Sequence, residues 1–521
     1  MDSASALEPQ AFVGRLDWRV TRTQLTLGLV LLALAVRCAG LTARPLWLDE
    51  AFTGWFTAQS WHYLWTVLPT YEAHPPFYYS LLKLWRTIVG GEALALRSFS
   101  VVFSVALIPV VVAAAFEHER LVPSGRPLLR AGVAAFLAAC SPMLVILGQE
   151  ARCYPLLTFA FAVAVLGLLR LMVQFRDRKS GDWPSWLLLG AGTELTLWSH
   201  SLGLLYSICL ALALAPAWLA TPMRRDRLIK GIMVATVVAV TYLPCLMLVM
   251  GRAHDWGANW LVWEPWMLVQ LFVLYSVPVE AMTIASAVAA LAMLLLIKRG
   301  ITSAIANRGW NADRALLLLW LGPPLLAALI SAVFVPVFLA RTLVGTLVPA
   351  YLVIGSAVAR SPSRRERLLL TSAMVITLLV TAFQVATRDP AERWDLVAAY
   401  LRRNVSAHDQ VWIYPSDSAI PLDRLGRRPG ETRLIPAAFP TMGVKGPIRA
   451  GWPAMVSVTP EQARDLAQAP GLKDVRVIWL VTRQSGIFDP DNDMPRALAQ
   501  VRSPGQIQEW GYINIRPYYR R

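Results

Sequence analysis

Long apolar stretches recur through the first three quarters of this chain, and they constrain its fold more than any other feature. Each is about 18 residues or longer, which is enough for a helix to cross the hydrocarbon core of a bilayer. The chain has 521 residues, 56% of them hydrophobic and 16% charged, whereas a soluble protein carries about a quarter charged residues. The pattern predicts a polytopic α-helical membrane protein. Its spans, about eleven in number, are expected at 23–41, 94–116, 129–147, 153–174, 184–200, 202–220, 229–250, 279–298, 314–334, 342–359 and 367–386.

The distribution of positive charge predicts how the chain is oriented. The net charge is +16, and arginines and lysines cluster before the first span and in every second loop, which is typical of cytoplasmic segments. With an odd number of spans, the N-terminal segment 1–22 is expected in the cytoplasm and the tail 387–521 in the periplasm of a bacterial cell envelope. Since topology explains the charge, nucleic acid is not an expected partner. No cleavable apolar segment precedes the first span, so we expect that span to be retained.

The five cysteines all lie in or next to predicted spans, at Cys38, Cys140, Cys153, Cys209 and Cys245. No CxxC pair is present. We therefore expect neither a disulfide framework nor a thiolate metal site.

Two predicted outer segments are not simple linkers. The first outer loop, 42–93, mixes aromatic with polar residues, and its parts 50–68 and 76–90 are typical of amphipathic helices at the membrane interface. The tail is polar and about the size of one small domain. A helix over 391–403 and buried strands over 411–414 and 475–481 predict a small C-terminal α/β domain.

A carboxylate pair, Asp49 and Glu50, stands where the first outer loop begins. Ionisable groups at the apolar boundary are costly and often functional. If the outer face transfers sugar from a lipid-phosphate donor, one carboxylate suffices to deprotonate the attacking hydroxyl, and Asp49 is the candidate. Alternatively, Asp49 caps a helix that starts near Ala51. Glu50 either tunes Asp49 by like-charge repulsion or faces solvent.

A departing phosphate needs cations, and arginine matches phosphate oxygens with its planar fork. Arg152 and Arg341 each stand at the outer end of a predicted span, and Tyr154, two residues after Arg152, is a further candidate contact of the donor phosphate. Either arginine binds the donor phosphate, or it forms an ion pair (Arg152 with Glu150) or extends to lipid headgroups. Lys83 is a further phosphate-binding candidate; the alternative is that it contacts only the phosphates of membrane lipids.

A divalent metal ion is a possible cofactor. Pro75 favours extended backbone before it, which places Glu72 and His74 on one side of the chain, and His254 from a later outer loop is a further candidate ligand. The alternative is a polar loop with one titratable histidine. Glu194 and His200, near the end of the fifth span, are either structural hydrogen-bond partners or line the donor cavity.

Three motifs carry a resemblance to a known family. Leu48-Asp49-Glu50, then His74-Pro75-Pro76-Phe77-Tyr78-Tyr79, then Gln149-Glu150-Ala151-Arg152-Cys153-Tyr154 resemble bacterial members of the dolichyl-phosphate-mannose protein mannosyltransferase superfamily. These are glycosyltransferases of the GT-C fold, related to the lipid A aminoarabinose transferase. The resemblance covers about residues 20–390.

The resemblance implies a polyprenyl-phosphate sugar donor, an active site at the outer face and inversion at the anomeric carbon. It places the family's catalytic aspartate on Asp49, the glutamate before the Pro-Pro segment on Glu72, and two arginines on Arg152 and Arg341. We therefore expect a mannosyltransferase-like enzyme that moves a hexose or pentose to a glycolipid, glycan or protein. The alternative from another class is a transporter or lipid flippase without bond chemistry; a scaffold that has lost activity is a third.

Overall fold

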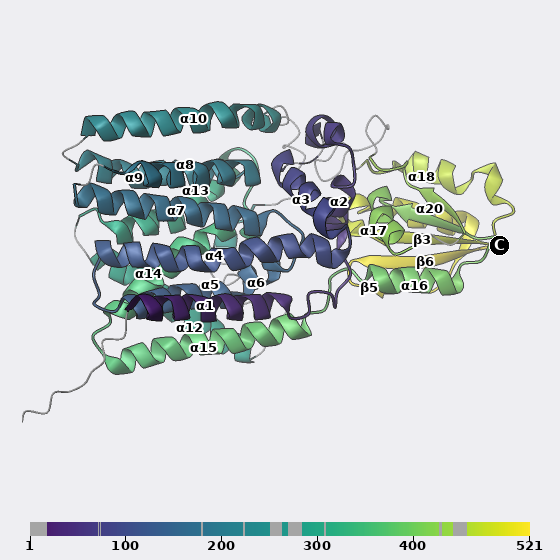
Figure 1. Cartoon of the computed structure of the whole chain (residues 1–521). Helices are drawn as coiled ribbons and strands as arrows, with labels where there is room; N and C mark the ends of the chain where they lie inside the picture. The colour runs from purple at the N-terminus through teal and green to yellow at the C-terminus, as the bar shows by residue number, and fades with distance from the viewer. Residues whose placement is uncertain are drawn as a thin grey trace, which may run out of the picture.

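A bundle of long helices and a smaller sheet domain lie end to end in this chain (Figure 1). The computed structural model describes residues 18–70, 72, 74–178, 181–221, 224–250, 263–268, 284–306, 309–426, 430–440 and 456–521. The predicted fold class, a polytopic helical membrane protein with a small C-terminal sheet domain, is confirmed.

The bundle has a helix at each place where the sequence predicts a span. These helices are α1 (Trp18–Cys38), α4 (Ala93–Leu121), α5 (Pro127–Cys140), α6 (Pro142–Gly148), α7 (Tyr154–Arg176), α8 (Trp183–Ser199), α9 (Gly203–Leu219), α10 (Arg224–Met250), α12 (Ile284–Ala306), α13 (Ala312–Val333), η5 (Ala340–Thr346) with α14 (Leu347–Arg360), and α15 (Arg364–Thr387).

Eight helical segments in the described part are long and apolar enough to cross a membrane, and one pair of bent helices passes the same test when taken together. This pair is α5 and α6, at the span predicted over 129–147. The two helices meet at an angle of 53°, because Pro142 cannot continue the hydrogen-bond ladder of α5. α8 and α9 have 17 residues each. The number of crossings, their orientation and the domain boundary at residue 387 stay predictions.

Apolar side chains cover the outside of the bundle as well as its interior. Along α10, Val237, Val240 and Met247 are each more than 60% exposed. Water would penalise such a continuous apolar face, whereas lipid chains are an equally apolar solvent. The composition that predicted membrane spans therefore appears in the structure as exposed apolar helix faces.

α7 and α8 pack closely because glycines remove side chains from their interface. A Cβ atom on Gly192 would collide with the backbone of Ala164, and one on Gly167 would collide with the backbone of Leu189. Small residues of this kind allow membrane helices to approach each other. The packing brings the end of α8, next to His200, close to the start of α7, next to Cys153.

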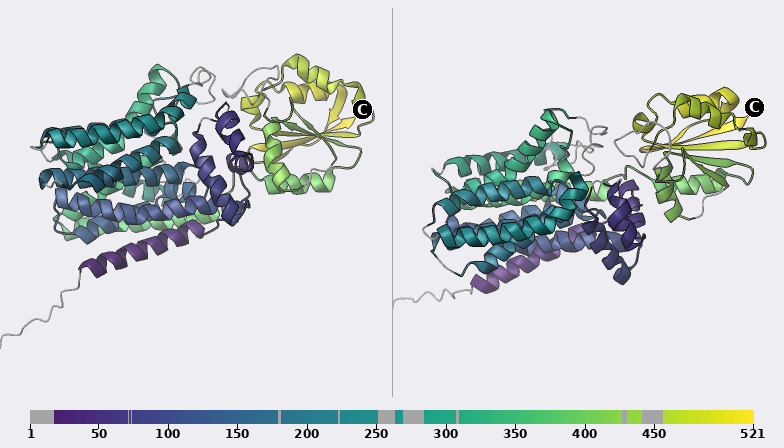
Figure 2. Two further views of the ribbon diagram at one scale, coloured as in Figure 1. Left: turned by 45° about the horizontal axis from the view of Figure 1, so that its top comes forward. Right: turned by 90° about the horizontal axis from the view of Figure 1, so that it is seen from above.

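The first outer loop folds into short helices between the bundle and the sheet domain (Figure 2). They are α2 (Leu48–Phe56), η1 (Tyr63–Val67), η2 (Leu68–Thr70) and α3 (Pro76–Val89). The prediction of one helix over 50–68 is wrong, because α2 ends at Phe56 and a turn separates it from η1. The second predicted helix, over 76–90, corresponds to α3. It begins at a proline, and Gly90, with φ of 96°, follows its last residue.

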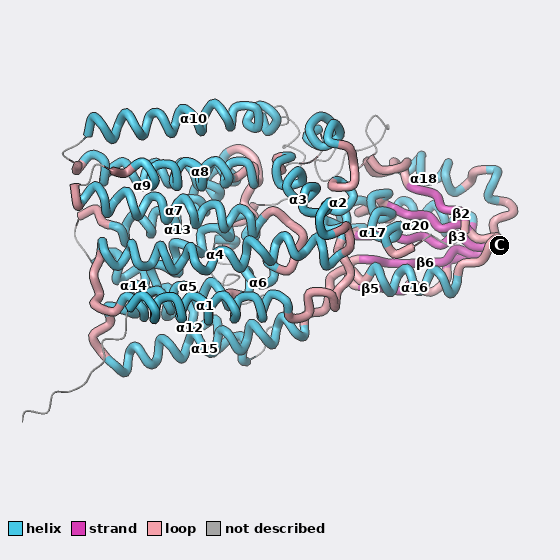
Figure 3. Tube along the Cα trace, in the orientation of Figure 1, coloured by secondary structure: helices cyan, strands magenta, loops and turns pink. Residues whose placement is uncertain are grey.

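The C-terminal domain contains a six-stranded mixed sheet in the order β2-β1-β3-β6-β4, with β5 paired to β6 (Figure 3). β1 pairs in parallel with β2 and β3, and β6 pairs antiparallel to β3. The elements are α16 (Trp394–Asn404), β1 (Gln410–Tyr414), η6 (Ser416–Ser418), α17 (Ala419–Arg424), β2 (Glu431–Leu434), α18 (Pro460–Ala467), η7 (Pro470–Leu472), β3 (Val477–Arg483), α19 (Ser485–Phe488), α20 (Asp493–Val501), β4 (Arg502–Pro504), β5 (Gln508–Trp510) and β6 (Ile513–Arg520).

Alternate residues of the central strands point to opposite faces of the sheet. On one face Trp412 and Ile478 pack with α18 and α20, and on the other Val411 and Trp479 pack with α16. Burial on both faces explains the continuous apolar runs that predicted β1 and β3. Both strands and the α16 helix are confirmed, with β3 beginning two residues later than predicted.

Candidate active site

Asp49 lies in the first turn of α2, and α2 lies at the end of the bundle that faces the sheet domain (Figure 1). The helix begins at Leu48 with Trp47 as the N-cap residue, so the alternative in which Asp49 caps a helix near Ala51 is wrong. A carboxylate in the first turn is favoured by the helix dipole. The Asp49 side chain keeps 24% exposure, which leaves it accessible to a reactant.

Two arginines from distant parts of the chain converge on the Asp49 carboxylate. The Nη2 atoms of Arg152 and Arg341 each lie 3.8 Å from Asp49 Oδ2. Both distances are at the long end of ion pairing and too long for a hydrogen bond. The Nε atoms of both arginines are buried with no hydrogen-bond partner among the described residues. The two guanidinium groups therefore have unused donors beside a single carboxylate.

Arg152 is held rigidly at this place. It is buried, with 6% exposure, and its Nη1 donates to the Asp49 carbonyl at 3.4 Å. Burial opposes its charge, but Asp49 and neighbouring groups raise the pKa of Arg152 well above its usual value, so it stays cationic. The predicted alternative of an ion pair with Glu150 is not found: Glu150 faces Arg388 at 3.9 Å, and burial raises its pKa to about 7.

Tyr154 and Lys83 were the other predicted phosphate contacts. Tyr154 is buried at the start of α7, two residues after Arg152. The structure does not bring Lys83 to this group. Its Nζ donates to the carbonyls of Thr57 at 3.3 Å and Gln59 at 2.5 Å, so its hydrogen bonds join α3 to the turn after α2.

Glu50 is fully buried, so the predicted solvent-facing alternative is wrong. Arg97 on α4 donates two hydrogen bonds to its carboxylate, from Nε to Oε1 at 2.8 Å and from Nη2 to Oε2 at 2.6 Å. The backbone amide of Ala151 donates to Oε1 at 2.9 Å. These contacts tie α2 to α4 and to the segment that carries Arg152. They support a positioning role for Glu50 beside the candidate base Asp49.

The C-terminal domain also holds the helix that carries Asp49. Glu392 Oε2 accepts hydrogen bonds from the Leu48 amide at 2.8 Å and from Trp394 Nε1 at 2.7 Å, while Oε1 accepts from Arg483 Nε at 2.7 Å. The Leu48 amide is one of the donors that a helix start leaves unsatisfied. Nothing local in the sequence marks Glu392, because its partner is more than 300 residues away.

Aromatic packing adds a second contact between the domain and α2. The Phe439 ring lies 5.0 Å from the ring of Phe52 and 5.6 Å from that of Trp55, measured between centroids. Arg424 Nη2 also donates to the Gly91 carbonyl at 2.7 Å. The domain and the first outer loop thus form one packed unit around Asp49.

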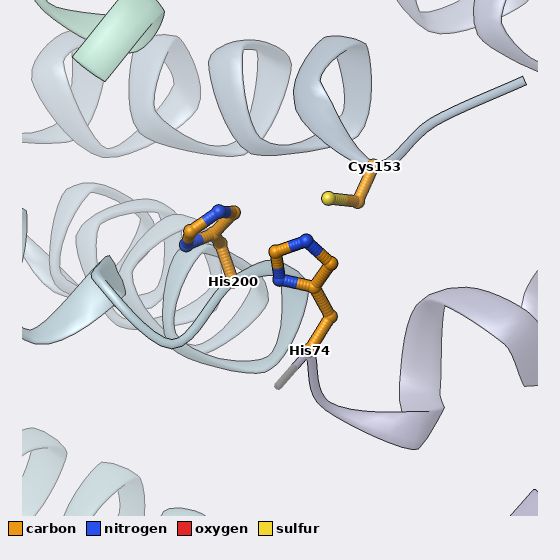
Figure 4. A group of neighbouring side chains, drawn as sticks. All are labelled: His74, Cys153 and His200. Atoms are coloured by element: carbon orange, nitrogen blue, oxygen red, sulfur yellow. The ribbon is translucent and has the colours of Figure 1, made fainter. Parts of the chain in front are cut away.

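Of the predicted metal ligands, His74 alone belongs to a group of three potential ligands among the described residues. Glu72 Oε1 accepts the backbone amide hydrogen of His74 at 3.2 Å, and His254 lies outside the described residues. The His74 ring instead lies beside Cys153 and His200 (Figure 4). Cys153 is thus one of three neighbouring potential ligands, a grouping that the sequence did not predict.

Glu194 and His200, near the end of the fifth predicted span, each have a hydrogen-bond partner. Glu194 Oε1 accepts from Trp198 Nε1 at 2.7 Å, and His200 Nδ1 accepts the Leu202 amide hydrogen at 3.0 Å. Both residues thus make structural hydrogen bonds. Sequence reasoning missed the grouping of His200 with Cys153, whose only sequence signal is that both residues lie at the outer ends of adjacent spans.

No protein-family model matches the chain, and no curated protein matches its sequence. Solved structures do match. The structure of ArnT from Cupriavidus metallidurans bound to undecaprenyl phosphate aligns with a TM-score of 0.59 at 12% identity, covering 96% of this chain and 98% of that one. ArnT in the apo state gives a TM-score of 0.58 at 11% identity, with 96% and 97% covered.

The archaeal oligosaccharyltransferase AglB from Archaeoglobus fulgidus, in complex with an inhibitory peptide and a dolichol-phosphate, aligns with a TM-score of 0.56 at 13% identity. The alignment covers 97% of this chain and 75% of that chain. At these identities the likeness shows the fold. The chain has the GT-C-like fold that its motifs predicted.

Proposed function

We propose that this protein is an inverting glycosyltransferase that uses a polyprenyl-phosphate sugar as donor. The observation that carries the proposal is the approach of Arg152 and Arg341 to Asp49 at 3.8 Å each. The group combines a carboxylate that can accept a proton with two cations that can receive a phosphate. Two structures of the same fold support the ligand class, because they contain undecaprenyl phosphate or a dolichol-phosphate.

The proposed reaction needs three events at this group. Asp49 takes the proton from the acceptor hydroxyl as that oxygen attacks the anomeric carbon of the sugar. The attack comes from the face opposite the phosphate, so the configuration at the anomeric carbon inverts as its bond to the phosphate oxygen breaks. The lipid phosphate leaves with the bonding electron pair and needs no added proton, because a phosphate is already ionised near neutral pH.

Arg152 and Arg341 stabilise the charge that develops on the leaving phosphate. Their buried Nε donors have no partner among the described residues, and charge-assisted hydrogen bonds to a phosphate contribute about 1.5–3 kcal/mol each. Phosphate binding breaks no hydrogen bond between these arginines and the Asp49 carboxylate, because both contacts are longer than a hydrogen bond. Lys83 has no part in this proposal, because its donors serve the turn after α2.

The remaining components follow from the same proposal. The acceptor is a glycolipid, a glycan or a protein at the periplasmic face of the inner membrane, and the C-terminal domain lies there beside Asp49. In this orientation the segment before α1 is cytoplasmic, and a tag placed after Arg521 is reached by a reagent confined to the periplasm. A tag shielded from that reagent contradicts the orientation.

The test is turnover of a labelled donor. Purified full-length protein is incubated with a polyprenyl-phosphate sugar and a membrane extract that supplies acceptors, and free polyprenyl phosphate is measured. A glycosyltransferase releases the lipid phosphate and labels an acceptor. A transporter or flippase, reconstituted in vesicles, moves the lipid between leaflets and leaves the sugar–phosphate bond intact; that outcome overturns the proposal.

A further inference from the structure

Three side chains that bind metals in other proteins meet at the outer ends of α7 and α8. His74 precedes α3, Cys153 precedes α7, and His200 follows α8, so each comes from a different loop. Their ligand atoms all lie within 4.8 Å of one another. Figure 4 shows the Cys153 sulfur and the two imidazole rings converging from three sides.

Two nitrogen atoms in this group lack partners. His74 Nδ1 and His200 Nε2 are both buried, and neither has a hydrogen-bond partner among the described residues. The two rings lie with their centroids 4.5 Å apart and are inclined by 50° to each other, so they are not stacked. Buried polar atoms are rarely left unpaired unless a ligand, ion or water occupies the site.

The chemistry of the group suits a soft cation. Its three side chains offer two imidazole nitrogens and one sulfur, and Cys153 and His200 are buried. Neutral imidazole and thiolate are the forms that bind such metals.

We infer that His74, Cys153 and His200 bind one divalent transition-metal ion of the zinc class. Imidazole nitrogen and thiolate sulfur are the ligands that zinc prefers, whereas magnesium and calcium require oxygen. Three protein ligands leave a fourth, open coordination position. This ligand set shares only His74 with the set that the sequence predicted, and it does not depend on the proposed sugar transfer.

Metal binding at this site requires one proton to leave and another to move. Binding releases one proton, from the Cys153 thiol. His200 Nδ1 accepts the Leu202 amide hydrogen at 3.0 Å, which places the ring proton on Nε2 in the unloaded site. On binding, that proton moves to Nδ1, and the Leu202 contact is lost. Metal binding is therefore weaker at acidic pH, because thiolate formation is coupled to it.

The site would also fix the neighbouring phosphate-binding segment. Cys153 directly follows Arg152, and Ser100 Oγ donates to the Arg152 carbonyl at 3.4 Å. A metal bond at Cys153 adds a second anchor to this short segment. Its thiolate also offsets part of the positive charge that the ion brings near Arg152 and Arg341.

Cobalt titration tests the inference, because a thiolate bound to Co²⁺ gives a sulfur-to-metal charge-transfer band in the near ultraviolet. The full-length protein is purified in detergent, stripped with a chelator and titrated with CoCl₂. We expect one equivalent to bind with this band. Cys153→Ser removes the band, whereas the matched control Cys140→Ser, a buried cysteine in α5, keeps it. A band that persists in Cys153→Ser, or no band in the wild type, overturns the inference.

A measurement on the unaltered protein covers the case in which a variant does not fold. The wild type is loaded with Zn²⁺, and X-ray absorption at the zinc edge gives the nearest atoms. We expect one sulfur and two imidazole nitrogens, completed by an oxygen. A coordination shell of zinc without sulfur, or far less than one zinc ion bound per protein molecule, contradicts the proposed site whatever the protein's activity.

Discussion

Glu392, just before α16, accepts the backbone amide hydrogen of Leu48 at 2.8 Å through Oε2. The same carboxylate receives Arg483 of β3 at 2.7 Å through Oε1. Leu48 is the first residue of α2 and immediately precedes Asp49. The sheet domain therefore positions the helix that carries the proposed base, in addition to any role in holding an acceptor.

Replacement of Glu392 by Gln is expected to lower both stability and activity. Glutamine retains an oxygen acceptor for Leu48 but leaves the cation of Arg483, which is 8% exposed, without its charge partner. We expect the free energy of unfolding to fall by about 1–3 kcal/mol and donor turnover to fall with it. Asp395→Asn is the control, since Asp395 forms a more exposed pair with Arg393. Equal behaviour of the two variants in thermal unfolding would show that the buried charge pair of Glu392 and Arg483 contributes no more than an exposed pair.

The buried pair of Glu50 and Arg97 gives a second prediction. Removing one partner leaves an uncompensated buried charge, so Arg97→Met should cost about 3–5 kcal/mol of stability. The double variant Glu50→Leu/Arg97→Met removes both charges and should recover part of that loss. Unfolding of the single and double variants measures the coupling. A double variant as unstable as the two single losses added together contradicts the account.

Asp417 predicts a dependence of stability on pH. Burial, opposed by Arg483 and assisted by Glu392, raises the pKa of Asp417 from its ordinary value to about 7. A raised pKa in the folded state contributes stability below the unfolded pKa of about 4, and this is lost as pH rises through about 7.

The wild type should therefore unfold more easily at pH 8 than at pH 5. Asp417→Asn should remove this contribution to the pH dependence and be more stable than the wild type at pH 8, by at most roughly 4 kcal/mol. Thermal unfolding across this pH range makes the comparison, with the exposed Asp423→Asn as control. A wild type and an Asn variant with parallel pH profiles would refute the assignment.

The two arginines should act on donor binding. Arg152→Gln and Arg341→Gln each remove charge-assisted hydrogen bonds, and we expect the affinity for undecaprenyl phosphate to fall about 10- to 100-fold. Arg120, an exposed arginine near the opposite end of α4, supplies the control Arg120→Gln. Binding is measured with the purified protein and the labelled lipid. Unchanged affinity in both site variants would exclude these arginines as the phosphate contact.

Residue pattern was sufficient for the architecture and for part of the site. Apolar length predicted helices where α1, α4, α7 and α15 lie, because a bilayer demands long apolar segments of any chain that crosses it. The family resemblance pointed to Asp49, Arg152 and Arg341, and the structure brings each arginine to 3.8 Å from the Asp49 carboxylate. Local signals also found β1 and β3, whose apolar runs reflect burial on both faces.

Pairing between distant residues could not be predicted. Glu50 was expected to tune Asp49 or to face solvent. Its partner Arg97 lies in the next predicted span, and nothing in the sequence shows that the two meet. The same holds for Glu392 with Leu48 and for His200 with Cys153. Each contact depends on how helices pack, which in turn depends on close approaches such as that of Gly192 to α7.

Turnover by the Asp49→Asn variant tests the central claim most directly. Asparagine has nearly the same shape as aspartate but cannot accept the proton, so release of polyprenyl phosphate should fall at least about 100-fold. Binding of undecaprenyl phosphate should be unchanged or tighter, because a negative charge next to Arg152 and Arg341 is removed. The exposed Asp389→Asn should retain full turnover. Wild-type turnover by Asp49→Asn would contradict the assignment of Asp49 as the base.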